Sequence, residues 1–537
     1  MMKFTLAGVP LALLAISGYL ANARGPYSLS QNFDPEYGYL LSSLSILRLH
    51  VPTFTDNPGT TVEEIGAGVS GGKWIAARIA GGGESISRAI LAHPEDYLRA
   101  IHFALAVIVA GSVFWAGWTM FHLSGSLTAG LVLQLSVFLF RETIIAMARV
   151  SPEPLLIAAS FLMGSMLLPA ILPAREGVAS IPDVEARSAR WAGVLWGLGV
   201  ATKFTSIPLG AMVGIFGTWK ARRRFVLTGI AAGLLFTMPI WPILDRPAQW
   251  LYGTLIHKGY YGQGERGLPA VSQMLSNLRA LVHDEPSLFG LGLFYLVFLA
   301  IVSAMKPATD DRLAPAVKRL LWSGLACIAI QLAATVKHYR PHYMIPAFGV
   351  MALINGCVAL LLFSPAWNTR VRAVLTPAVA FLSAAGIVHA AWNADQWGQR
   401  GAFQERDAAE LAQVAAGMPE CVVIGYYRSS ATGFGVEWGS EYAAGASADT
   451  MKEVFPDTIF YNRFQHRFRS SALEPRFGEV RQMLRQGRCV LMQGTPVTED
   501  PLTLPPGFSI TPVAENGKII ERPNEALYRL AWTPSAP

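Results

Sequence analysis

The sequence predicts an α-helical polytopic membrane protein with about 11 transmembrane helices and a C-terminal α/β domain. Of its 537 residues, 52% are hydrophobic and only 15% are charged, whereas about a quarter of the residues in a soluble protein are charged. Long apolar runs recur up to about residue 394, and from Asp395 the composition becomes that of a soluble domain. We therefore expect a membrane domain at residues 1–394 and a small soluble domain at residues 395–537.

The formal net charge of +7 does not indicate a nucleic-acid partner. Lys and Arg cluster beside the hydrophobic segments, where basic residues set membrane topology against an anionic inner leaflet. The expected surroundings are membrane lipid, with no nucleic acid.

The first apolar run covers residues 4–20 and ends at Ala21-Asn22-Ala23, which also resembles a signal cleavage site. We expect an uncleaved first helix, because the downstream chain is itself membrane-embedded. In either case residue 24 onward is exported. Residues 24–99 then form a large outer loop, of a length that is usually functional, and its stretch from Tyr37 to Leu49 is expected to lie on the membrane surface.

Further apolar spans cover roughly 101–121, 127–147, 154–172, 191–218, 225–244, 288–305, 320–336, 343–363 and 373–392. A single crossing needs about 20 residues, so the 191–218 span is long for one helix. Arginines flank it on both sides, which places both of its ends in the cytoplasm. We expect a hairpin of two short helices with Lys203 near its outer tip. This topology leaves a second outer loop at 245–287 and puts the soluble domain outside.

The soluble domain shows two short apolar stretches typical of buried strands, Cys421–Tyr426 and Cys489–Gly494, each preceded by a helical pattern (403–416 and 476–487). The four cysteines have no metal-binding spacing. Outside the cytoplasm Cys421 and Cys489 form a disulfide or remain two buried thiols, and the sequence favours neither.

The outer loop carries the motif Asn32-Phe33-Asp34-Pro35-Glu36-Tyr37 directly after the first helix. Ionised side chains at a bilayer edge are kept mainly where they line a wet cavity or a site. We interpret this stretch as a catalytic loop. The alternative for Asp34 is a helix N-cap, since Asp before Pro and Glu suits that position.

Four motifs resemble the GT-C superfamily of integral-membrane glycosyltransferases, in the branch of protein mannosyltransferases and aminoarabinose transferases. They are Asp34-Pro35-Glu36-Tyr37, Ala148–Pro154, Gly197–Thr205 and His338–Pro346. The resemblance covers residues 1 to about 365. The sequence departs from the protein-mannosyltransferase pattern at Pro35, which separates Asp34 from Glu36, whereas the two acids are usually adjacent in that pattern. The resemblance implies transfer of a sugar from a polyprenyl-phosphate donor to a glycan, lipid or protein acceptor outside the cytoplasm, usually with inversion.

Such a transfer needs a base for the acceptor hydroxyl and cations for the leaving phosphate. Asp34 is the first candidate for the base. Glu36 is a further catalytic candidate, a sugar ligand or a solvated loop acid. Asp56 is a third catalytic candidate, or simply a turn residue in Asp-Asn-Pro-Gly. Asp34 and Asp56 either hold a divalent ion, Mg²⁺ or Mn²⁺, or act without one.

The candidate phosphate and substrate ligands all fall in outer segments. Lys203 is expected at the hairpin tip, with snorkelling to the interface as the alternative. Arg149 either contacts substrate or pairs with Glu153. The remaining candidates precede a late helix or lie in the second outer loop, and they are Lys337, His338, Arg340, His342, Tyr343, His257, Tyr260 and Tyr261.

The sequence therefore predicts a GT-C-like glycosyltransferase of the bacterial inner membrane, with its active site and soluble domain on the periplasmic face. The alternative is a transporter or flippase of lipid-linked saccharides. Transporters commonly show repeated halves with charges near the midplane, whereas here no halves repeat and the charges gather on one side.

Overall fold

The computed structural model describes residues 2–29, 32, 34–55, 57–172, 181–259, 262–304, 313–363, 369–430, 433–443, 447–463, 465–471, 473–499, 501–515, 518–519, 522 and 524–533. By their contacts, they separate into two compact units. The membrane unit comprises Met1–Leu20, Thr55–Val62 and His102–Gln396. The sheet unit comprises Ala21–Phe54, Glu63–Ile101 and Trp397–Pro537. Most of the first outer loop thus belongs to the same unit as the C-terminal segment.

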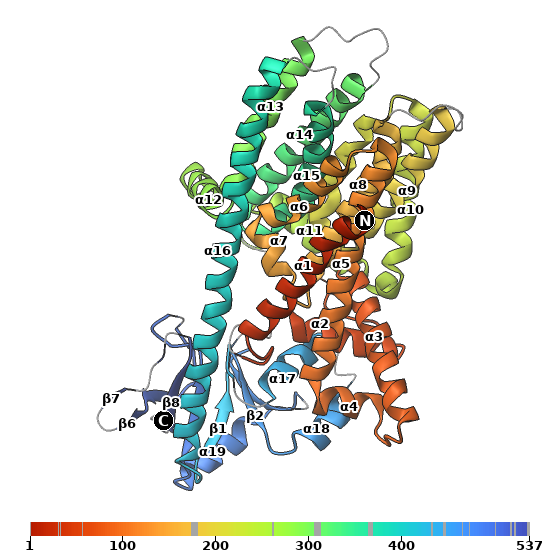
Figure 1. Cartoon of the computed structure of the whole chain (residues 1–537). Helices are drawn as coiled ribbons and strands as arrows, with labels where there is room; N and C mark the ends of the chain where they lie inside the picture. Colours follow the sequence, from red (N-terminus) through yellow and green to blue (C-terminus); the bar gives the residue numbers. More distant parts are fainter. Residues whose placement is uncertain are drawn as a thin grey trace. The chain divides into compact units, whose positions relative to one another are not determined.

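The helices up to residue 416 include long apolar rods and several short or 3₁₀ segments (Figure 1). They are α1 (Met2–Ala23), α2 (Glu36–Leu47), α3 (Thr60–Ile79), α4 (Ile86–Ala92), α5 (Pro94–Ser124), α6 (Leu127–Leu135), η1 (Ser136–Leu139), α7 (Arg141–Ala146), α8 (Pro152–Ile171), α9 (Ile181–Thr202), η2 (Phe204–Ile215), α10 (Trp219–Phe236), η3 (Met238–Ile243), α11 (Asp245–Ile256), α12 (Val271–Asp284), α13 (Pro286–Ala304), α14 (Leu313–Lys337), η5 (Pro341–Met344), α15 (Ile345–Leu362) and α16 (Thr369–Ala416).

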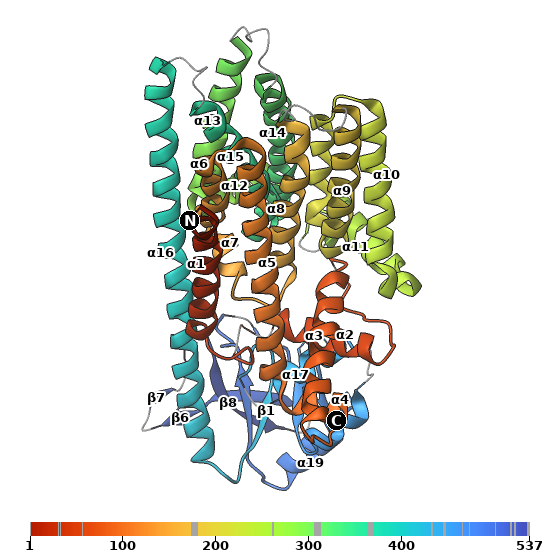
Figure 2. The same ribbon diagram turned by 45° about the vertical axis from the view of Figure 1, so that its right-hand side comes forward.

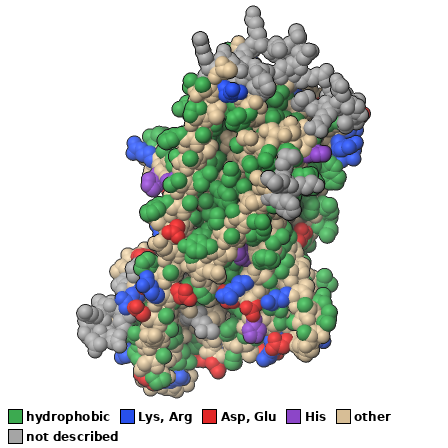
Figure 3. Space-filling model, viewed as in Figure 1, with side chains coloured by type: hydrophobic (Ala, Val, Ile, Leu, Met, Phe, Trp, Pro, Cys, Tyr) green, Lys and Arg blue, Asp and Glu red, His purple; other side chains and the backbone are tan. Residues whose placement is uncertain are grey.

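Among the described residues, seven helices are long and apolar enough to cross a membrane, and two shorter apolar helices, Leu127–Leu139 and Phe204–Ile215, accompany them. On the face drawn in Figure 3, hydrophobic side chains cover much of the long helices of the membrane unit. This is a multi-pass membrane protein. The number of about 11 crossings and their orientation stay predictions.

Helix α15 forms the core of the membrane unit. Its side chains are apolar on all sides, and nearly every residue from Ile345 to Leu362 is buried. Its one amide, Asn355, accepts a hydrogen bond from the Tyr295 hydroxyl at 2.7 Å and donates one to Ser136 Oγ at 3.0 Å. The buried polar group is thus satisfied by neighbouring helices, as a water-free interior requires.

The sequence predicted a hairpin of two short helices in the 191–218 span, and the structure has a break at Lys203 but not two short α-helices. Helix α9 ends at Thr202, Lys203 is extended, and the chain continues as the 3₁₀ helix η2 rather than as a second α-helix. Helices α8, α9 and α10 lie side by side (Figure 2). Glycine permits the closest approach: a Cβ on Gly197 of α9 would lie 2.2 Å from the Gly229 carbonyl oxygen of α10.

Two expectations about helices need correction. The 127–147 span is not continuous but is divided into α6, η1 and α7. The stretch Tyr37–Leu49 is not a membrane-surface helix, because every residue of α2 from Glu36 to Ser45 is buried. Tyr37 packs against Gly435 and Gly439 of α17 (Phe434–Glu441), within the sheet unit. Burial on all sides leaves α2 no apolar face for lipid.

The described strands of the C-terminal segment form a six-stranded mixed sheet in the order β3-β2-β1-β4-β8-β5 and a two-stranded ribbon of β6 and β7. Strand β1 runs parallel to β2 and β4, and the other pairs of the large sheet are antiparallel. The elements are β1 (Val422–Gly425), α17 (Phe434–Glu441), α18 (Ala448–Val454), β2 (Ile459–Asn462), β3 (Arg467–Ser470), α19 (Phe477–Arg485), β4 (Val490–Gly494), β5 (Phe508–Pro512), β6 (Ala514–Glu515), β7 (Lys518–Ile519) and β8 (Ala526–Trp532). This is the expected small α/β fold.

The two cysteines before the central strands form a disulfide, Cys421–Cys489. In the sheet, Val422 pairs with Val490, so the cysteines lie at neighbouring positions just before paired strands. The sequence left this pairing open, and strand register decides it. Cys327 and Cys357 are free and buried.

Candidate functional site

A cluster of charged side chains in the membrane unit forms where α8 begins and α9 ends. Lys203 Nζ lies 2.6 Å from Glu153 Oε1, and these side chains are only 6% and 9% exposed. Glu153 stands in the first turn of α8, where the helix dipole favours a carboxylate. Lys203 therefore does not snorkel to an interface, and it forms an ion pair with Glu153.

Four further candidates lie near this pair. His342 Nε2 is 3.9 Å from Glu153 Oε1, and Lys203 Nζ lies 5.2 Å from the centre of the Tyr343 ring. Arg149 and Arg340 are both close enough to interact electrostatically with His342. Three chain segments, at residues 149–153, at Lys203 and at residues 340–342, thus bring ionisable groups into one region near Glu153. We call Glu153, Lys203, His342, Arg149 and Arg340 the cation cluster.

The motif Asp56–Thr61 contributes to the position of Lys203. Thr61 Oγ1 lies 2.7 Å from Thr202 Oγ1, and Gly59 N donates to the Thr202 carbonyl at 3.3 Å. Thr60 Oγ1 donates to the carbonyl of Phe236 at 2.7 Å. The loop segment is therefore bonded to the residue immediately before Lys203. Asp56 itself, like Tyr260 and Tyr261, lies outside the described residues.

Two of the expected phosphate ligands instead bind backbone carbonyls. Lys337 Nζ donates to the carbonyls of Thr254 and Leu255 at 2.8 and 2.6 Å, and His338 Nε2 lies 2.8 Å from Thr254 O. These carbonyls belong to the last turn of α11, where they lack helical partners. Burial lowers the pKa of His338, which favours its neutral form. The two side chains cap α11 in this conformation.

His257 has a comparable role at the same helix end. It is the C-cap residue of α11, and its Nδ1 lies 2.7 Å from the Gly262 carbonyl. Lys258 N donates to the Glu265 carbonyl, and the two side chains form an exposed ion pair at 2.6 Å. These contacts shape the described part of the second outer loop into a tight turn.

In the sheet unit, Asp34 and Glu36 occupy contrasting positions. Asp34 is exposed and precedes Pro35, the N-cap residue of α2, so it is one residue short of the expected capping position. Glu36 is fully buried and accepts a hydrogen bond from Arg24 at 2.9 Å. The expectation of a solvated acid at Glu36 is wrong. A sealed ion pair also makes Glu36 a poor base, because its carboxylate is held by a guanidinium.

Arg24 and Glu95 organise the backbone around Asp34. Arg24 Nη2 donates to the Asn32 carbonyl, while Asn32 Nδ2 donates to the carbonyls of Arg24 and Pro26. Glu95 accepts from Tyr27 N, Ser28 N and the Tyr37 hydroxyl at 2.8 to 3.0 Å. Described residues before and after Asp34 are thus held by buried and part-buried polar contacts.

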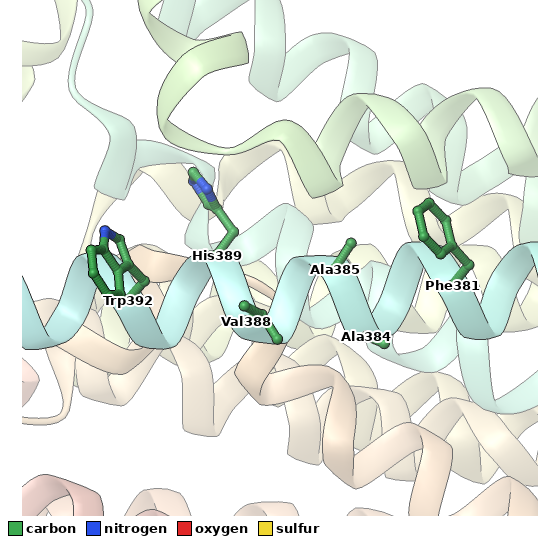
Figure 4. A pocket seen from close by; sticks show the side chains of 6 residues that line it. All are labelled: Phe381, Ala384, Ala385, Val388, His389 and Trp392. Carbon is green, nitrogen blue, oxygen red and sulfur yellow. The ribbon is translucent and has the colours of Figure 1, made fainter.

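A hollow of about 490 Å³ lies on the surface of α16, lined by Phe381, Ala384, Ala385, Val388, His389 and Trp392 (Figure 4). The two alanines leave space between the flanking Phe381 and Trp392 rings. Its lining is apolar apart from His389, whose Nε2 lies 3.2 Å from the Asp284 carbonyl. A surface of this composition suits a lipid environment and carries no acid–base pair.

Among the described residues, no three His, Cys, Asp or Glu side chains gather as a metal site would require. A divalent ion held by Asp34 and Asp56 stays a prediction, because Asp56 is outside that part of the chain.

The chain has a GT-C-like fold, in agreement with the resemblance inferred from the motifs. Two crystal structures of ArnT from Cupriavidus metallidurans are similar to the chain, each over 97% of both chains. The apo structure has a TM-score of 0.52 at 12% identity, and the structure bound to undecaprenyl phosphate has a TM-score of 0.50 at 14% identity. No family model and no curated protein matches the chain.

The sequence singled out Asp34, Lys203, Arg149, Arg340 and His342, but it did not find their supports. Arg24 is the first charged residue after the first helix, and its partner is 12 residues away. Thr60 and Thr61 follow the Asp-Asn-Pro-Gly stretch, which is typical of a turn, so their contacts with α9 and α10 were not predicted. Glu95 was not among the candidate site residues.

Proposed function

We propose that this protein is a glycosyltransferase that takes a sugar from a polyprenyl-phosphate donor and passes it to an acceptor hydroxyl on the extracytoplasmic face of the membrane. The cation cluster, within a GT-C fold, is the observation that carries the proposal. Lys203, Arg149 and Arg340 supply cationic side chains, and a guanidinium holds phosphate oxygens in a bidentate manner. A structural neighbour with this fold binds undecaprenyl phosphate.

In this mechanism the cation cluster binds the donor phosphate and stabilises the charge that develops as the sugar–oxygen bond breaks. Asp34 accepts the proton of the acceptor hydroxyl as that oxygen attacks the anomeric carbon, and the configuration inverts. An exposed carboxylate on a loop with fixed flanks suits this role. General-base assistance contributes about 10²-fold to 10⁴-fold.

The test is sugar transfer in membranes supplied with radiolabelled polyprenyl-phosphate sugars. Asp34→Asn keeps the shape of the side chain and removes the base, so transfer should fall by about 10²-fold or more while donor binding remains. Asp96→Asn, an exposed acid of the same loop, is the matched control and should transfer normally. Unchanged transfer by Asp34→Asn would exclude it as the base, and the absence of transfer by the unaltered chain with every donor would exclude the function.

A further inference from the structure

Helix α12, in the segment predicted as the second outer loop, has three sides of different character. One side packs on the protein, because Asn277 and Leu281 are buried. A second side is polar and exposed, and its residues are Ser272, Ser276, Arg279 and His283. The third side is apolar, and its residues are Val271, Leu275, Leu278 and Val282. Their spacing puts these four apolar side chains in one row along a helix of 3.6 residues per turn. We call them the apolar row.

The apolar row faces the surroundings of the protein. Val271 is 72% exposed, Leu275 49% and Val282 42%, while Leu278 is partly buried. Leu268, just before the helix, is 69% exposed. Single exposed apolar side chains are common on protein surfaces. A continuous row of them instead indicates a surface that is covered in the native environment.

Helix α12 lies at the ends of two helices that are long and apolar enough to span a membrane. Only Glu285 separates it from α13. Asn277 Nδ2 donates to the carbonyl of Val336, in the last turn of α14, at 2.8 Å. The hydroxyl of Tyr339, just beyond α14, donates to the Asp284 carboxylate. Helix α12 is thus fixed where α13 begins and α14 ends, and Figure 1 draws it at the outer side of the membrane unit.

Position and pattern together select the lipid bilayer as the partner of the apolar row. A helix in a membrane interface needs one apolar side toward the acyl chains and one polar side toward water. Helix α12 has both of these beside its protein-facing side. Helix α13 continues the exposed apolar surface with Leu293, Leu296 and Val297, which are between 46% and 65% exposed. The polar side of α12 carries the cation Arg279 and no carboxylate, which suits anionic headgroups.

We propose that α12 is an interfacial helix that docks on the lipid bilayer through its apolar row. The row enters the boundary between headgroups and acyl chains, and Ser276 and Arg279 face headgroups and water. A surface helix was predicted in the first outer loop at Tyr37–Leu49, where α2 is buried. In this assignment the second outer loop supplies the surface helix instead.

Docking of α12 has a consequence for the cation cluster. The contacts with Val336 and Tyr339 hold the chain just beyond α14 close to the docked helix. Arg340 and His342 follow directly in that segment. A lipid-linked phosphate lies at the depth of the headgroups, so a docked α12 keeps these two residues at the depth of such a phosphate. This consequence rests on the proposed function, whereas the docking on the bilayer does not.

The test is fluorescence quenching of the full chain in nanodiscs of phosphatidylcholine and phosphatidylglycerol, both faces of which are open to solvent. An NBD fluorophore is attached to Leu275→Cys or to the matched control Ser276→Cys, on the polar side of the same turn. The chain without an added cysteine gives the background labelling, since Cys327 and Cys357 are buried. At position 275, a nitroxide on the lipid acyl chains should quench most of the fluorescence and iodide little. At position 276, iodide should be the stronger quencher.

Equal access of iodide to both positions, without quenching by the lipid nitroxide at position 275, overturns the proposal. A label at position 275 that neither quencher reaches also overturns it, because another protein surface then covers the apolar row.

A charge on the apolar row gives a second measurement. In a chain labelled at Val271→Cys, Leu275→Glu should raise quenching by iodide, whereas Ser276→Glu should not. Equal effects of the two substitutions would contradict the assignment of the apolar row as the contact with lipid. None of these results depends on sugar transfer. A chain that docks on lipid but transfers no sugar would contradict the proposed function and leave the docking of α12 standing.

Discussion

Two buried ion pairs, Arg24–Glu36 in the sheet unit and Lys203–Glu153 in the membrane unit, look alike and are surrounded differently. Both are nearly inaccessible, with side-chain exposures of 2% and 0% in the first and 6% and 9% in the second. Arg24 also donates to the Asn32 carbonyl and lies over the rings of Tyr27 and Trp397. The first pair is embedded in protein groups that hold a loop in place.

The Lys203–Glu153 pair instead has further ionisable neighbours. His342 lies near Glu153, Arg149 and Arg340 interact electrostatically with His342, and the buried Thr205 hydroxyl has no hydrogen-bond partner among the described residues. Burial therefore does not by itself distinguish a structural ion pair from an ion pair in a functional site. A convergence of like charges costs stability, and this cost is typical of a binding site.

Breaking the Arg24–Glu36 ion pair should have the largest effect on the stability of the chain. Arg24→Met or Glu36→Gln alone leaves one buried charge without its partner, which costs about 3–5 kcal/mol of stability. The double variant Arg24→Met/Glu36→Gln should recover much of this loss and retain most of the transfer activity. Thermal unfolding of the purified chain measures the effect, and a double variant as unstable as either single variant would argue against a purely structural pair.

The matched double variant Lys203→Met/Glu153→Gln should show that the second ion pair, unlike Arg24–Glu36, is needed for sugar transfer. It leaves no charge of the pair unpaired, so the chain should fold, but it removes a fixed cation from the leaving phosphate. We expect transfer to fall by about 10²-fold to 10³-fold. Transfer at the level of the unaltered chain would place the phosphate site elsewhere.

The Glu437–Arg469–Glu441 cluster of the sheet unit extends the comparison, because it places two acids on one guanidinium. Burial raises the pKa of Glu437 from its ordinary value of 4.5 to about 7, against the opposing effect of Arg469. Between these values the folded chain keeps a proton that the unfolded chain has released, so stability falls as the pH rises. Glu437→Gln should reduce this fall by on the order of 2 kcal/mol. The free energy of unfolding is measured at pH 4.5 and pH 7.5 for both chains. An equal loss of stability between these pH values in both chains would refute the raised pKa of Glu437.

The smallest effect is expected at Thr61. Thr61→Val keeps the shape and removes the hydroxyl contact with Thr202, worth about 1 kcal/mol. If this contact positions Lys203, KM for the lipid-linked donor should rise about fivefold while kcat changes little. Thr376→Val is the control, since the Thr376 hydroxyl has no partner among the described residues. An equal effect in both variants would assign the contact to stability alone.

The membrane fold was largely predictable from the sequence, because hydropathy and helix length constrain a chain in lipid directly. The break at Lys203 followed from counting residues against membrane thickness, and the strands at Val422 and Val490 from short apolar runs. Among the site residues, Lys203, Arg149, Arg340 and His342 stood out because charge at a helix end is costly.

Contacts between distant segments could not be predicted. A solvated acid was one of the alternatives for Glu36, yet Glu36 is buried against Arg24 in a helix that contacts α17, which no local pattern around residue 36 could indicate. Lys337 and His338 were predicted as phosphate ligands, and the carbonyls that they contact lie more than 80 residues away in the sequence.

The most direct test of the account is binding of undecaprenyl phosphate to the purified chain, because it requires no knowledge of the sugar. The unaltered chain and Arg24→Met/Glu36→Gln should bind it with similar affinity, and Lys203→Met/Glu153→Gln should bind it at least about tenfold more weakly. Equal binding by all three chains, or a loss confined to the Arg24–Glu36 variant, would contradict the assignment of the cation cluster to the phosphate.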